Sequence, residues 1–90
     1  MPLITILIRC RELTAVSHDA MYATWSISQI VAVLDRGVAA LERETELNRD
    51  ELKLLFAPTG DLQETSIANG WAKEYLLLAA RFDDLIVEAV

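Results

Sequence analysis

The chain has 90 residues, of which 53% are hydrophobic, and it carries a formal net charge of −6 at pH 7. This length corresponds to one small domain, and an acidic surface repels phosphate backbones, which disfavours nucleic acid as a partner. The single cysteine, Cys10, excludes an intrachain disulfide and a zinc site made of cysteines alone.

Residues 1–16 are compatible with either a helix or a strand. Their apolar start, Met1–Ile8, ends at Arg9 and is too short for a signal peptide or a membrane span. We therefore expect a cytoplasmic protein that does not bind membranes. β-Branched residues favour a strand, but an isolated strand is unstable and no second strand is evident. Helix is the favoured prediction, because apolar residues also recur at helical spacing: Leu3, Ile6, Leu7, Cys10 and Leu13.

A long helix is predicted for residues 18–47, with Ser17 as its N-cap. Its main apolar stripe consists of Ala23, Ile27, Ile30, Val31, Leu34, Val38 and Leu41. A second apolar patch, which includes Tyr22, Trp25 and Val33, lies apart from this stripe. A glycine inside a helix costs about 1 kcal/mol relative to alanine, so Gly37 indicates close approach of another helix or a slight bend.

A short helix is predicted for residues 49–57, with Asn48 as its N-cap and acidic residues in its first turn. The connector at residues 58–70 follows, and its Asp61 and Glu64 predict a short helical turn at 62–67. Loops carry functional groups more often than regular elements do. The connector is therefore either a candidate site or a capped turn, and its candidate residues are Pro58, Thr59, Gly60, Asn69 and Gly70.

The C-terminal helix, predicted for residues 71–89, is too apolar for an ordinary surface helix. Its apolar side chains cover roughly 220° of the helix surface, whereas a surface helix needs a stripe of only about 100°. Two antiparallel helices of one chain cannot bury two such wide faces, but two hairpins packed face to face can. We therefore predict a dimer with a four-helix core.

Several large side chains are candidates for this dimer interface: Tyr22, Trp25, Val33, Trp71, Tyr75, Phe82 and Ile86. Asp83 is added to them because helical spacing places it within the apolar arc of the C-terminal helix. An unpaired buried charge is costly. We therefore expect Asp83 to meet an arginine, such as Arg36 or Arg81, or a backbone donor, or to lie at the edge of an interface.

One spacing resembles a known family. Arg11 and His18 are separated as R-x6-H, which falls within the loose R-x(4–6)-H pattern of HEPN ribonucleases. The resemblance implies a metal-independent RNA-cleaving site assembled across a helical dimer, and a helix continuous through Ser17 would place the pair nearly on one face. The alternative is an exposed histidine near the start of a helix.

The fold prediction is an all-α domain with two long helices and one short helix, self-associated into a dimeric core that resembles a four-helix bundle. The predicted function is a non-catalytic intracellular adaptor or regulatory module that acts through helical protein–protein interfaces. The acidic surface would suit a basic protein partner. We expect no cofactor and no metal. The alternatives are a HEPN-like ribonuclease and a structural subunit of a larger assembly.

Overall fold

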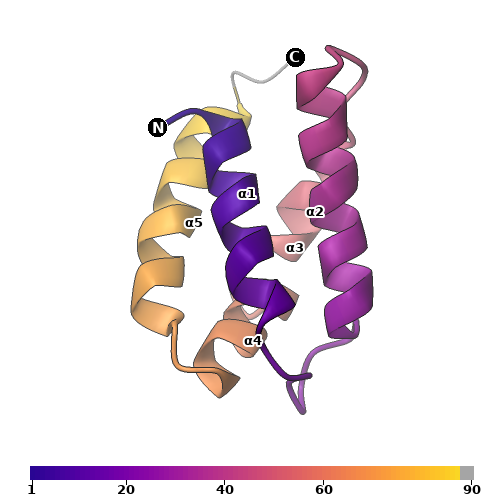
Figure 1. The fold of residues 1–90 in the computed structure, drawn as a ribbon. Coiled ribbons are helices and arrows are strands. Elements are labelled where there is room, and N and C mark those ends of the chain that lie inside the picture. Colours follow the sequence, from indigo (N-terminus) through magenta and orange to yellow (C-terminus); the bar gives the residue numbers. More distant parts are fainter. Residues whose placement is uncertain (88–90) are drawn as a thin grey trace.

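The structure, a computed structural model, describes residues 1–87. Within them the fold is all-α, as predicted, and no residue lies in a strand. The five helices are α1 (Leu3–Ala15), α2 (Ile27–Glu42), α3 (Arg49–Leu55), α4 (Asp61–Ala68) and α5 (Ala72–Ile86). Figure 1 shows α1 in the middle, between α5 and α2, with α3 behind and α4 across the lower end. No helix in the described part is long and apolar enough to cross a membrane.

The segment that was compatible with a helix or a strand forms the central helix of the fold. The buried positions of α1 follow the predicted helical spacing, and they are Leu3, Ile6, Leu7, Cys10 and Thr14. The Thr14 hydroxyl is buried and donates to the Cys10 carbonyl one turn back, at 2.7 Å. Because α1 packs against α2, α4 and α5, it covers much of the apolar surface of the two other long helices.

The second helix begins at Ile27 and not at residue 18. Ser26 is its N-cap and forms a capping box with Gln29: the Ser26 hydroxyl accepts from the Gln29 N–H at 3.3 Å, and the Gln29 side chain accepts from the Ser26 N–H at 2.8 Å. The Asp19 carboxylate accepts from the Ile27 N–H at 2.8 Å. The predicted cap, Ser17, instead donates its hydroxyl to the Leu13 carbonyl at the end of α1.

The same helix ends at Glu42, before the predicted residue 47. Glu44 has a φ of 55°, in the left-handed region that terminates helices. The Thr45 N–H reaches back to the Ala40 carbonyl at 3.0 Å and closes the turn. Residues 43–48 therefore form a connection to α3.

Gly37 lies where two other helices meet α2. A Cβ at this position would be 3.0 Å from Leu7 Cδ1 and 3.4 Å from Leu52 Cδ2. The predicted close approach of another helix is therefore confirmed, and it involves both α1 and α3.

The connector contains a helix longer than the predicted turn. Asn48 caps α3 as predicted, since its side chain accepts from the Glu51 N–H at 3.1 Å. The chain then turns at Thr59, which has a φ of 59°, and α4 runs for two turns from Asp61. At its end Gly70 has a φ of 81°, which a residue with a side chain rarely adopts.

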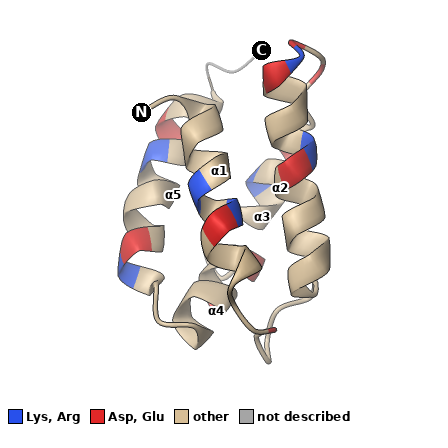
Figure 2. Cartoon of the chain, viewed as in Figure 1, with Lys and Arg blue, Asp and Glu red and all other residues tan. Residues whose placement is uncertain are grey.

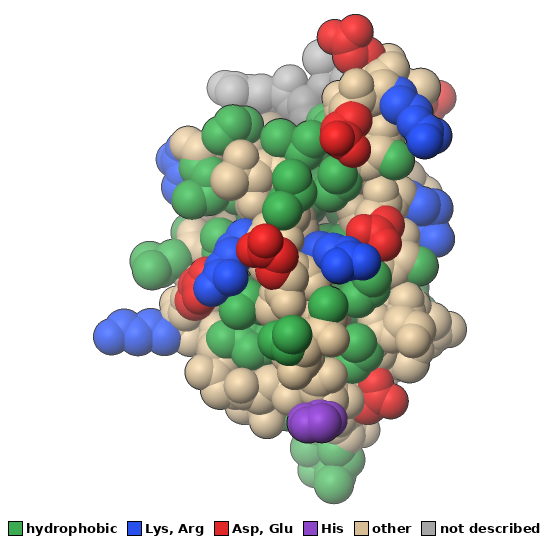
Figure 3. Space-filling view, in the orientation of Figure 1, with side chains coloured by type: hydrophobic (Ala, Val, Ile, Leu, Met, Phe, Trp, Pro, Cys, Tyr) green, Lys and Arg blue, Asp and Glu red, His purple; other side chains and the backbone are tan. Residues whose placement is uncertain are grey.

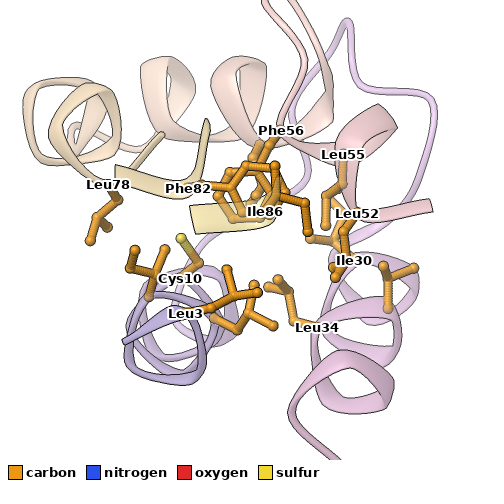
Figure 4. Packing of buried hydrophobic residues seen from close by; sticks show 14 of the residues in the cluster. Leu3, Cys10, Ile30, Leu34, Leu52, Leu55, Phe56, Leu78, Phe82 and Ile86 are labelled. Carbon is orange, nitrogen blue, oxygen red and sulfur yellow. The ribbon is translucent and has the colours of Figure 1, made fainter. Parts of the chain in front are cut away.

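One core joins all five helices (Figure 4). Phe56, at the end of α3, stacks on Phe82 of α5 with ring centroids 3.9 Å apart and planes 6° apart. The helix α5 ends at Ile86 with Val87 as its C-cap, and residues 88 and 89 of the predicted helix lie outside the described residues. One face of α5 is thus buried within this chain itself, because α1 and the α3–α4 region supply cover that the two-helix prediction omitted.

Candidate functional site

The predicted interface residues fall into two groups. Five of them are buried in the monomer core and contact residues of the same chain: Val33, Trp71, Tyr75, Phe82 and Ile86. The other three reach the surface. Tyr22 is 80% exposed, Trp25 is half-buried, and Asp83 is exposed.

Asp83 does not lie in a buried arc. Its neighbour on the helix surface, Leu76, is also exposed, so this side of α5 faces solvent in the monomer. Within residues 1–87 neither Arg36 nor Arg81 pairs with Asp83: Arg36 binds Glu51, and Arg81 lies 3.8 Å from Asp84. A solvated carboxylate needs no such partner.

The loop between α1 and α2 is held by side chains of α4 and of its C-cap. The Asp61 carboxylate accepts from two main-chain N–H groups, those of Thr24 at 2.8 Å and Trp25 at 2.9 Å. Asn69 binds the main chain of His18 at the other end of the loop. These hydrogen bonds satisfy main-chain N–H and C=O groups of the loop that have no partner within a helix. They also fix the position of Trp25.

A cleft of about 230 Å³ lies between this loop and the α3–α4 turn. It brings together members of both predicted groups, since Tyr22 and Trp25 line it together with Thr59 and Gly60. Of the other connector candidates, Pro58, Asn69 and Gly70 do not line it. Gly60 is required by the turn itself, because a Cβ there would be 2.8 Å from the Ala57 carbonyl oxygen.

Two further hollows continue along the line between α2 and α3, with volumes of about 260 and 180 Å³. The hollow of 260 Å³ shares Trp25 with the cleft. The two further hollows have Val33, Arg36 and Glu51 in common. We call the three together the α2–α3 groove. The Arg36 guanidinium spans it and binds both Glu51 carboxylate oxygens at 3.1 and 3.2 Å. No local sequence pattern predicts this ion pair, because it depends on how α3 packs against α2.

Ion pairs link α1 to both α5 and α2. Arg9 donates to the two Glu74 carboxylate oxygens of α5 at 2.6 and 3.0 Å, and Arg11 donates to Asp35 of α2 at 3.0 Å. The Arg9 hydrogen bond raises the pKa of Arg9 and lowers the pKa of Glu74. Charged positions on α1 lie between those of α5 and α2 in Figure 2, and Figure 3 shows the resulting charged band with hydrophobic side chains above and below it.

The geometry expected for a HEPN-like pair is not met. α1 ends at Ala15, and His18 belongs to the following loop. Arg11 is already engaged with Asp35. The two residues therefore do not share one face of a continuous helix.

The side of α5 opposite the core carries exposed apolar side chains. Leu76, Leu77 and Val87 are 58, 69 and 67% exposed, and Ala80 lies exposed among them. We call this surface the outer face of α5. Helical spacing places the exposed charged residues Lys73 and Asp84 within this face, between Ala80 and Leu77, and it places Asp83 at the edge of the face.

Within residues 1–87 no group of three or more His, Cys, Asp or Glu side chains is arranged to hold a metal ion. Comparisons with protein-family models, with curated proteins and with solved structures returned no match to this chain.

Proposed function

We propose that this protein is a non-catalytic intracellular adaptor or regulatory module that self-associates through the outer face of α5. The observation that supports this most directly is that α5 carries large apolar side chains on two sides. One side is buried in the core, while Leu76, Leu77 and Val87 stay more than half exposed on the other. Apolar side chains that gather on a monomer surface mark interaction sites.

The charged residues of α5 favour a second copy of this chain as the partner that covers its outer face. In a two-fold pair of antiparallel helices, the same flank of each helix meets its counterpart, and every contact occurs twice. Lys73 and Asp84 are three helical turns apart on the same side of α5, within its outer face. A pair centred between Leu78 and Ala79 puts Lys73 of each copy opposite Asp84 of the other, and it brings Leu77 against Ala80.

This interface would be small. The helix α5 has 15 residues and is therefore about 22 Å long. Interfaces that bury less than roughly 1,200 Å² in total belong to weak or transient complexes. We therefore expect a dimer that dissociates in the micromolar range, as suits a regulatory module.

Size-exclusion chromatography with light scattering across a wide range of concentrations tests the proposal. The mass of the wild-type protein should rise from monomer to dimer, and Leu76→Glu should remain a monomer because it buries a charge at the interface. Ile67→Glu is the matched control, since Ile67 is an equally exposed apolar residue on α4 and lies in neither the outer face of α5 nor the α2–α3 groove. A wild-type protein that stays monomeric at every concentration, or a Leu76→Glu variant that still dimerises, would contradict the proposal.

A further inference from the structure

We infer that the α2–α3 groove binds a cationic amphipathic helix of a partner protein. The inference rests on the proposed function as an interaction module, and it names the kind of partner. It does not depend on the α5 dimer, since α1 lies between α5 and α2 and separates the two surfaces (Figure 1).

The shape of the groove suits side chains of a helix better than a small molecule. Its three hollows have volumes of about 230, 260 and 180 Å³, each below the roughly 300–1,000 Å³ of small-molecule sites. The last two lie along α2, which rises about 20 Å from Ile27 to Ala40, and the first adjoins them at Trp25, just before this helix. A partner helix of three to four turns can therefore insert a side chain from successive turns, in the helix-in-groove mode.

The lining of the groove combines large apolar side chains that a partner can contact with small side chains that let a helix approach. At the end near the cleft, Tyr22 and Leu54 are 80 and 64% exposed, and Trp25 is half-buried beside them. Tyrosine and tryptophan are enriched among the residues that contribute most to binding. Farther along, the floor includes Ala32 and Ala40, whose small side chains allow another helix to approach α2.

The charges of the groove favour a basic partner over a second copy. Its lining contains the acidic residues Glu46, Glu51 and Asp61 but only one basic residue, Arg36, which already binds Glu51. A second copy would bring the same net charge of −6 to this acidic surface. Lysine or arginine side chains along the flanks of a partner helix would meet opposite charge at both ends of the groove, which speeds encounter and fixes orientation.

Fluorescence anisotropy with two designed probes tests the inference. Both are labelled helical peptides with leucine at helical spacing along one face, and they carry either lysine or glutamate on the flanks of that face. The lysine peptide should bind the full-length protein, and added salt should weaken the complex. The glutamate peptide should bind at least about tenfold more weakly, because like charges would face each other across the groove.

A matched pair of variants separates groove binding from general attraction to an acidic protein. Ala32→Arg adds a charge and bulk inside the groove, and it should weaken the lysine peptide about tenfold or more. Ser28→Arg makes the same change in net charge on an exposed position of α2 outside the three hollows, and it should leave the affinity unchanged. The inference is wrong if neither peptide binds, if both bind equally, or if the two variants weaken the lysine peptide to the same extent.

The same variants distinguish this inference from the proposed dimer. Leu76→Glu should change the mass measured by light scattering and leave peptide binding intact, whereas Ala32→Arg should do the reverse. If Ala32→Arg instead abolishes dimerisation, a second copy occupies the groove and the inference fails.

Discussion

The side-chain amide of Asn69 hydrogen-bonds both main-chain groups of His18. Asn69 Oδ1 accepts from the His18 N–H, and Asn69 Nδ2 donates to the His18 carbonyl, each at 2.8 Å. The same Nδ2 also donates to the Thr65 carbonyl at 2.9 Å. Asn69, the residue after α4, thus supplies hydrogen-bond partners to a loop that is far away in the sequence. It holds the start of the α1–α2 loop, whose later residues Tyr22 and Trp25 line the cleft.

Asn69→Ala should loosen the start of this loop without unfolding the domain. Each of the three lost hydrogen bonds contributes about 0.5–1.5 kcal/mol, so the free energy of unfolding should fall by about 1.5–4.5 kcal/mol. In hydrogen exchange read by NMR, the His18 amide should lose protection, while the Thr24 and Trp25 amides should keep theirs because Asp61 still holds them. Asp61→Ala should give the opposite pattern. Equal loss of protection at both ends in both variants would show that the loop is not held at two separate points.

Gly37 should tolerate no large side chain. The Cβ of any replacement would already lie 3.0 Å from Leu7 Cδ1, and the remaining atoms of a leucine would have to displace α1 or α3. Overpacking of a core costs about 1–3 kcal/mol, so Gly37→Leu should lower the free energy of unfolding in urea by that amount. Ala39→Leu, at a half-buried position of the same helix, should have little effect. A fully stable Gly37→Leu variant would mean that the helices do not meet closely there.

Cys10 should make the fold sensitive to alkali. Burial raises the pKa of its thiol from 9.0 to about 12, so the unfolded chain loses this proton at a lower pH than the folded one. The contribution to stability is complete below pH 9 and is lost as the pH rises towards 12. Urea denaturation should therefore show a fall in stability over this window that is smaller in Cys10→Ala. Part of the fall should persist, because burial also raises the pKa of Tyr75; an identical profile for both proteins would contradict the assignment to Cys10.

Charge reversal on α5 should report the geometry of the proposed dimer. Lys73→Asp or Asp84→Lys alone would place like charges opposite each other at both ends of the helix pair, and each should weaken dimerisation. The double variant Lys73→Asp/Asp84→Lys restores opposite charges and should recover the wild-type dissociation constant in sedimentation equilibrium. A double variant as weak as the single ones would exclude the antiparallel register.

Local patterns in the sequence predicted the helical class well but located one helix start poorly. Ser17 and Ser26 are both good N-caps, and the apolar stripe begins before Ile27. What selects Ser26 is partly local, since Gln29 completes its capping box. The rest is tertiary: Asp61 and Asn69 bind the main chain between the two serines, and their position relative to this loop cannot be derived from periodicity.

The sequence predicted residues of the candidate site as two separate groups, but not that they meet in one cleft. Tyr22 and Trp25 were singled out as an excess apolar patch, and Thr59 and Gly60 were singled out as a break in the chain. The packing of α3 and α4 against the loop brings these four residues to one cleft. The prediction also assigned Tyr75 and Phe82 to a dimer interface, because it counted two long helices and left out the cover that α1 provides.

The central position of α1 has a consequence for valency. A pair of chains joined at α5 would carry two α2–α3 grooves, each on the side of its own bundle that faces away from the junction. A partner with two basic helices on a tether of matching length would engage the second groove at a high effective concentration, and its avidity would exceed the affinity of either helix alone. The dissociation constant of the dimer would then set the concentration of this protein above which such bivalent partners stay bound.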